Sequence, residues 1–154
     1  QSYKDSGLIT EEDIVEAIPK TLQDNIFDLT QLILTKKIDQ ARDLVKDLTL
    51  QGEDEIKLIA IMLGQFRLYT QVKILQESGQ TESQMVSSLG HYLGRNPNPY
   101  QIKFALRDTR ALSLNFLQDS IRYLIQADYQ IKTGVYEKGY LFEKALLQIA
   151  SQSN

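Results

Sequence analysis

The chain has 154 residues, a net charge of −3 and no cysteine, so it is long enough to form one domain without disulfides. The lack of cysteine also excludes thiol catalysis and cysteine-ligated zinc, and it is typical of a cytoplasmic protein. Residues 1–52 carry ten acids and six bases, and residues 53–154 carry ten acids and eleven bases. Neither half has the strongly basic field that nonspecific nucleic-acid binding requires.

The N-terminal region predicts a short acidic helix followed by a break in the chain. Residues 10–18 combine Thr10 as an N-cap with acids in the first turn. Pro19 closes this helix, and residues 19–21 are interpreted as a linker and a domain boundary. The chain opens Gln-Ser-Tyr-Lys without an initiator methionine, so we expect a fragment of a longer protein. We expect neither a signal peptide nor a membrane span.

Two amphipathic helices are predicted next, at 23–36 and at about 38–51. Gly52 stands at the usual C′ position of the second helix. Because only a few residues separate the two helices, we expect them to be antiparallel neighbours.

Residues 53–78 predict a long helix that is apolar on most sides. Three acids, Glu53 to Glu55, stand at its start, where the helix dipole favours negative charge. A helix that is apolar on most sides must be covered on most sides, so we expect it to be the central helix of a bundle. Its apolar positions include Ile56, Ile59, Leu63, Phe66 and Val72 on one face, and Leu58, Ile61, Met62, Leu68 and Leu75 on others.

The remaining segments predict helices and one loop. Thr81 and Gln84 form a capping box for a helix to about Leu89, and residues 90–100, which contain His91, read as a loop. Asn98 as N-cap and Pro99 at the first helical position begin a helix to about Leu112. The pattern then predicts a helix at 114–133, capped by Ser113 and ended by Gly134, and a last helix at about 136–151. The predicted fold class is all-α.

Motifs of known chemistry are absent from the sequence. It has no glycine-rich phosphate loop, no G-x-S-x-G and no H-E-x-x-H motif, and His91 is its single histidine. We therefore predict no catalytic, cofactor-binding or metal-binding residue.

Asp128 stands at a position of the 114–133 helix where the apolar period calls for a core residue. A buried carboxylate needs a partner, and Lys132 one turn away, Arg67 or Arg110 would serve. The alternatives are a helix edge with an ordinary i,i+4 ion pair and a contact between subunits. The predicted core stripe is Leu117, Ile121, Leu124, Asp128 and Ile131.

Two segments suggest nucleic-acid contact. Residues 81–110 resemble a helix-turn-helix whose second helix carries Lys103, Arg107 and Arg110, although the connection is longer than usual. Residues 132–140, KTGVYEKGY, interleave bases with tyrosines that can stack on a nucleotide or pack one end of the bundle.

The order of several short motifs resembles a known family. They are I-T-x-E-D-I, N-I-F-D-L, L-x-L-x-G, G-Q-F-R-L, V-K-x-L, L-G-R-N-P, A-D-Y-Q-I-K-T-G and L-F-E-K-A-L-L. Together they resemble the C-terminal part of the bacterial DNA polymerase III delta subunit, a clamp-loader component, from about Ile9 to Ile149.

The resemblance implies that residues 1–20 are the tail of an AAA+-like lid domain with its linker. Residues 21–152 would be the helical collar, an oligomerisation domain that packs with the tau/gamma and delta-prime subunits. The full-length protein would belong to the polymerase holoenzyme, bind the sliding clamp through a missing N-terminal module and act on primed DNA indirectly. Neither a cofactor, a membrane partner nor intrinsic catalysis is implied for this fragment. A DNA-binding regulator that uses residues 81–110 is the alternative function.

The resemblance also implies roles for four residues. Asp128, Lys132 and Glu143 match the A-D-x-x-I-K and L-x-E positions and would be structural or interface residues of the collar. The loop near Gly134 faces the inside of the ring in that family, which makes Tyr136 the candidate for a DNA contact.

Overall fold

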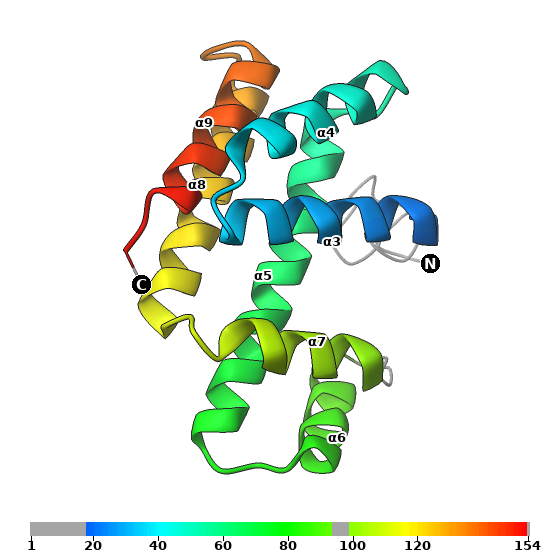
Figure 1. The fold of residues 1–154 in the computed structure, drawn as a ribbon, viewed down its shortest axis with the longest axis vertical. Helices are drawn as coiled ribbons and strands as arrows, with labels where there is room; N and C mark the ends of the chain where they lie inside the picture. Colours follow the sequence, from blue (N-terminus) through cyan, green and yellow to red (C-terminus); the bar gives the residue numbers. More distant parts are fainter. Residues whose placement is uncertain (1–17, 94–98, 154) are drawn as a thin grey trace. The chain divides into compact units, whose positions relative to one another are not determined.

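The computed structural model describes residues 18–93 and 99–153, and all seven elements in these ranges are α-helices. The prediction of an all-α fold is thus confirmed (Figure 1). The predicted helix at 10–18 and the predicted cap at Asn98 fall essentially outside the described ranges. The division at residue 20 between a lid tail and a collar stays a prediction. The helices are α3 (Lys20–Leu34), α4 (Ile38–Leu50), α5 (Glu55–Glu77), α6 (Glu82–Leu93), α7 (Pro99–Thr109), α8 (Leu114–Lys132) and α9 (Lys138–Ala150).

The helices form two compact units, which we describe separately. The first unit holds α3, α4, the part of α5 up to Gln65, the part of α8 from Arg122, and α9. The second unit holds the rest of α5, the helices α6 and α7, and the beginning of α8.

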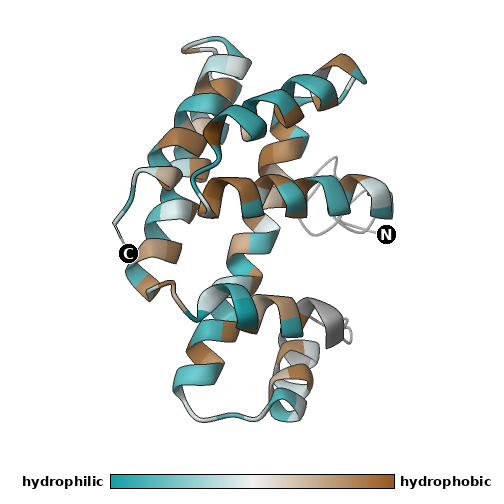
Figure 2. Cartoon of the chain, viewed as in Figure 1, coloured by the Kyte–Doolittle hydropathy of each residue, from teal (hydrophilic) through white to brown (hydrophobic). Residues whose placement is uncertain are grey.

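The core of the first unit is built from the apolar stripes of its helices. α3 contacts both α4 and α9, and α4 contacts α9. Hydrophobic and hydrophilic positions alternate around these helices (Figure 2), as expected where one face is buried. Each fully buried large apolar side chain contributes roughly 1.5–3 kcal/mol. Such side chains include Ile26, Leu29 and Ile33 of α3, and Leu141, Phe142 and Ile149 of α9.

The start of α3 corrects the prediction of a linker at residues 19–21. Lys20 and Thr21 are already helical, and Pro19 is the N-cap with φ −58°. The carbonyl of Pro19 accepts hydrogen bonds from the N–H groups of Leu22 and Gln23. Proline suits a helix start because its fixed φ is compatible with the first turn and its missing N–H leaves no donor unsatisfied there.

The end of α4 agrees with the prediction, since Gly52 follows the C-cap Gln51 with φ +95°. The chain also turns into the left-handed conformation after α3, but there the residue is not a glycine. It is Lys36, with φ +62°. Its side-chain amine donates to the carbonyl of Ala150 at the end of α9. A lysine thus closes one helix and caps the last turn of another.

The long helix α5 starts two residues later than predicted, at Glu55. Asp54 precedes it and accepts a hydrogen bond from the N–H of Ile56 at 2.8 Å, as an N-cap does. By length and composition α5 resembles a membrane span, but 56% of its most apolar window is buried within the structure. The helix is accordingly covered on several sides, because the five consecutive residues from Leu58 to Met62, which together go round the whole helix, are all buried.

In the second unit, the helix starts are as predicted. The N–H of Thr81 donates to Gln84 Oε1 at 2.8 Å, and the N–H of Gln84 donates to Thr81 Oγ1 at 3.2 Å. The N–H of Phe116 donates to Ser113 Oγ at 3.0 Å. These bonds confirm the capping box of α6 and the serine cap of α8.

Two helix ends in the second unit differ from the prediction. α6 continues to Leu93, so His91 belongs to a helix and not to a loop. Gly90 lacks the positive φ of a helix-ending glycine, and a glycine in a helix interior costs only about 1 kcal/mol. α7 ends at Thr109 instead of Leu112, where the N–H of Leu112 turns back to the carbonyl of Thr109.

Candidate interaction surface on α8 and α9

The part of α8 that belongs to the first unit buries Leu124, Ala127 and Ile131. Asp128 lies beside this stripe, with 25% of its side chain exposed, and Lys132 Nζ donates to its Oδ2 at 2.8 Å. The prediction that Asp128 occupies a core position is therefore wrong, because Ala127 takes that position. Of the alternatives, the structure matches the helix edge with an i,i+4 pair. A role of Asp128 in binding another subunit stays a prediction.

Glu143 lies on α9, the helix that follows the Asp128–Lys132 pair of α8. Its carboxylate forms an ion pair with Arg42 of α4, and both side chains are partly exposed. The structure thus brings Asp128 and Lys132 together and gives Glu143 a different partner. Sequence reasoning missed Arg42, because nothing in the order of residues links α4 to α9.

Tyr136 lies in the connection between α8 and α9 and is 64% exposed. Its ring meets that of Tyr140 edge to face, with centroids 5.8 Å apart. Gly134 makes the turn possible with φ +70°, and the N–H of Val135 returns to the carbonyl of Gln130. Because both tyrosines stay exposed, they do not pack the end of the bundle as one alternative proposed.

Exposed apolar side chains gather in this part of the chain. Of the eight large hydrophobic side chains found exposed among the described residues, five lie between positions 125 and 140. Tyrosine is enriched in protein interfaces, where its large ring is buried and its hydroxyl stays hydrogen-bonded. We call this set the tyrosine surface; its members are Ile125, Tyr129, Val135, Tyr136 and Tyr140.

A groove of about 520 Å³ adjoins the tyrosine surface at Tyr140. Its lining combines the outer face of α9 with one residue each from α4 and α8. The outward positions of α9 recur every three or four residues, so this face was readable from the sequence, whereas its neighbours Arg42 and Tyr123 were not. The α9 residues in the lining are Tyr140, Glu143, Lys144, Leu147 and Gln148, followed by Ser151 and Gln152.

The charges around this surface are mostly paired within the chain. Besides the two pairs described above, Lys138 Nζ donates to Asp54 Oδ2 at 2.9 Å. This bond is the main reason that the pKa of Asp54 is lowered, with the N–H of Ile56 adding to it, and it raises the pKa of Lys138. Paired charges leave little net field to attract a polyanion. In the described part of the chain, no three His, Asp or Glu side chains cluster to hold a metal ion.

Residues 23–149 match the family described as DNA polymerase III delta subunit, C-terminal domain. The DNA polymerase III subunit delta of Bacillus subtilis (strain 168) is 32% identical over 145 residues, which make up 94% of this chain and 40% of the relative. The solved structure of the Bacillus subtilis DNA clamp loader delta protein (YqeN) is 33% identical with a TM-score of 0.76, over 94% of this chain and 41% of that one. The chain thus spans about two fifths of the length of both relatives. It belongs to the family of C-terminal domains of DNA polymerase III delta subunits.

Proposed function

We propose that this chain is the assembly domain, or collar, of a DNA polymerase III delta subunit, and that it acts in the cytoplasm. The observation that carries the proposal is the family match over residues 23–149, supported by the likeness to a solved clamp loader delta protein. Residues 21–152 would form the collar and residues 1–20 the tail of the preceding lid domain. The whole protein would join tau/gamma and delta-prime subunits and help to place the sliding clamp on primed DNA.

The tyrosine surface and the groove beside it support an assembly role. Tyrosine and arginine are among the residues that most often dominate the binding energy of protein interfaces, and Tyr129, Tyr136 and Tyr140 are all more than half exposed. The paired charges around them suit a protein partner better than a nucleic acid. In this proposal Asp128, Lys132 and Glu143 orient the helices that carry the surface.

A DNA contact at Tyr136 remains a narrower proposal. Its exposed ring can stack on an unpaired base, and Lys132 and Lys138 lie on either side of it in sequence. Both lysines are already bonded to carboxylates, which reduces their attraction for phosphate.

The alternative of a DNA-binding regulator is not favoured by the family to which the chain belongs. The structure also weakens this alternative at Arg107, one of the three basic residues that suggested it. Arg107 of α7 is bound to Asp108 through two guanidinium nitrogens, each at 3.0 Å. A guanidinium held in this way has fewer N–H groups left for phosphate.

Analytical ultracentrifugation of the chain with purified tau/gamma and delta-prime subunits would test the assembly role. We expect one larger species that contains all the components. The double substitution Tyr129→Ser with Tyr140→Ser should weaken it, whereas Leu50→Ser, at an exposed apolar residue of α4, should not. Full-length delta added in excess should displace the chain. If the chain sediments alone and fails to compete with full-length delta, the assembly role is wrong.

A further inference from the structure

The exposed side of α7, in the second unit, combines cations with an aromatic ring. Lys103, Phe104 and Arg107, together with Arg110 directly after the helix, are all exposed. Their spacing places them within about a third of the helix circumference. We call these four residues the α7 basic face. The function proposed above does not use them.

The last turn of α7 is held in place by α5. The hydroxyl of Tyr69 donates to Asp108 Oδ2 at 2.7 Å, and Lys73 Nζ donates to the carbonyl of Thr109 at 3.1 Å. Both contacts lie within the second unit. A surface held in this way loses little conformational freedom when it binds a ligand.

The positive charges of the face are exposed while the nearest negative charge is covered. The side chain of Asp108 is 6% exposed, whereas that of Arg107, which binds it, is 55% exposed. The guanidinium of Arg107 lies 5.0 Å from the centre of the Phe104 ring, and 41% of Phe104 is exposed. An approaching ligand therefore meets cations around an aromatic surface.

The wider charge distribution decides which anion suits this face. Residues 66–121 carry six basic and four acidic side chains, although the whole chain carries a net charge of −3. A short ligand responds to charges within about 8–10 Å at physiological salt. A long polyanion also responds to the net negative charge of the whole chain, which opposes its binding. A short acidic protein segment is favoured over a nucleic acid.

We propose that the α7 basic face docks a short acidic segment of a partner protein, with Lys103 and Arg110 binding carboxylates on either side of an apolar side chain that packs on Phe104. Lys103 and Arg110 are seven positions apart, which spans about 10 Å along a helix axis. Two carboxylates three residues apart in a polyproline II segment lie on the same side and span a similar distance, at about 3.1 Å per residue. The proposal is independent of the assembly role.

Fluorescence anisotropy of a labelled peptide would test this docking site. The probe is a short extended peptide with aspartates three residues apart and leucine between them, and its control has asparagine for each aspartate. We expect the aspartate peptide to bind, more weakly as salt rises, and the asparagine peptide not to bind. The double substitution Lys103→Gln with Arg110→Gln should weaken binding about fivefold, as expected for two exposed charge pairs.

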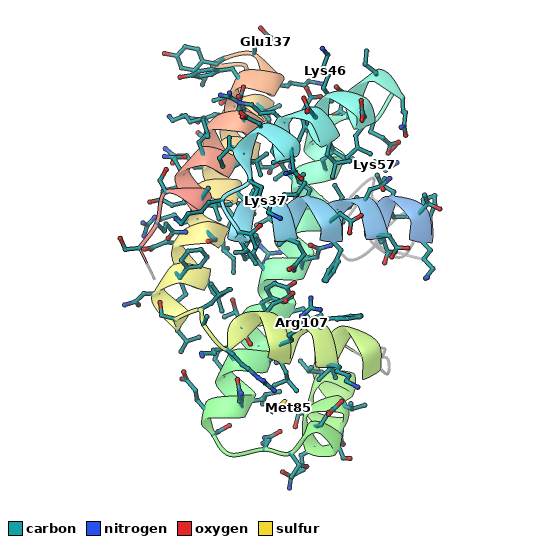
Figure 3. All side chains as sticks on the ribbon, in the orientation of Figure 1. Lys37, Lys46, Lys57, Met85, Arg107 and Glu137 are labelled. Carbon is teal, nitrogen blue, oxygen red and sulfur yellow. The ribbon has the colours of Figure 1, made fainter. Side chains whose placement is uncertain are left out.

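Matched substitutions separate the face from a general change in charge or hydrophobicity. Lys37→Gln with Lys46→Gln removes the same charge from exposed lysines of the first unit, where both are labelled in Figure 3, as Arg107 is on α7. This variant should bind as the unchanged chain does. Phe104→Ala should weaken binding, and Leu50→Ala, at the most exposed large apolar residue among those described, should not.

Three results would overturn the proposal. The aspartate peptide does not bind, or it binds the Lys103 and Arg110 double variant as well as it binds the unchanged chain. Alternatively, single-stranded or duplex DNA binds through Lys103 and Arg110 and displaces the peptide at lower concentration, which would make the face a nucleic-acid site. Because all the substituted side chains are exposed, circular dichroism should show unchanged helicity in every variant.

Discussion

Lys138 and Asp54 form a hydrogen-bonded ion pair across 84 positions of the sequence, with Nζ 2.9 Å from Oδ2. The other carboxylate oxygen of Asp54 accepts the N–H of Ile56 at 2.8 Å. One side chain thus caps the start of α5 and anchors the start of α9. The cap of α5 depends less on the negative charge of Asp54 than the ion pair with Lys138 does, so substitutions can separate the two functions.

Asp54→Ala should lower the free energy of unfolding by about 1 kcal/mol, the usual cost of losing an N-cap. Asp54→Asn should cost less, because asparagine caps helices about as well as aspartate does. Urea unfolding followed by circular dichroism would measure both. Asp43→Ala, at an exposed acid of α4, serves as the control and should have little effect. Equal costs for the alanine and asparagine variants would show that the charge, and not the cap, is what matters.

The stability difference between the unchanged chain and Asp54→Asn should depend on pH. Folding lowers the pKa of Asp54, so the stabilisation is complete above the unfolded-state pKa of about 3.9 and is lost as pH falls through the folded-state value. Folding raises the pKa of Lys138, so its stabilisation is complete below the unfolded-state pKa of about 10.4 and is lost at higher pH. The difference should be largest near neutral pH.

Urea unfolding of both proteins at acidic, neutral and strongly alkaline pH would test this dependence. The two stability curves should converge at both extremes of pH. A difference that stays constant from neutral to strongly acidic pH would show that the carboxylate of Asp54 does not stabilise the folded chain through its charge.

Substitutions at two neighbouring positions of α8 should lower the stability by very different amounts. Asp128→Ala removes an i,i+4 pair at the helix edge and should cost less than about 0.5 kcal/mol. Ala127→Asp places an unpaired carboxylate at a position that is 3% exposed and should cost several kcal/mol, or unfold the chain. Thermal unfolding of both variants would show which substitution lowers the stability more. A larger loss of stability for Asp128→Ala would contradict the position of the buried stripe of α8.

Lys36 combines an unfavourable backbone conformation with a useful side chain. Both Lys36→Gly and Lys36→Ala remove the bond to the carbonyl of Ala150. Only glycine relieves the cost of φ +62°. The glycine variant should therefore be about 1 kcal/mol more stable than the alanine variant. Urea unfolding of the pair measures this difference, and equal stability would mean that the left-handed turn is not strained.

The start and end signals of the helices were correct where a local bond decides them. The capping box of Thr81 and Gln84, the cap at Ser113 and the turn at Gly52 each involve groups within one helical turn. Such bonds form in the same way whatever else the chain packs against. The ordered motifs likewise carried the resemblance to the delta subunit family, which the family match confirms.

The core register of α8 depended on packing that the sequence does not display. Ser120 and Ala127 are buried, but small residues occur both inside and outside proteins. The apolar period therefore predicted Asp128 as a core position, whereas the buried stripe of α8 passes through Ala127. The side of a helix on which such residues lie is decided by the helices that cover it.

By itself, the sequence determined the all-α fold, most of the helix limits and the family, because these follow from local bonds, apolar period and motif order. The tertiary structure alone decided that Glu143 pairs with Arg42, that Lys138 pairs with Asp54, and that the tyrosine surface stays exposed. These relationships join side chains from helices far apart in sequence. Their distances and exposure exist only once the helices have packed, because packing determines which faces remain open.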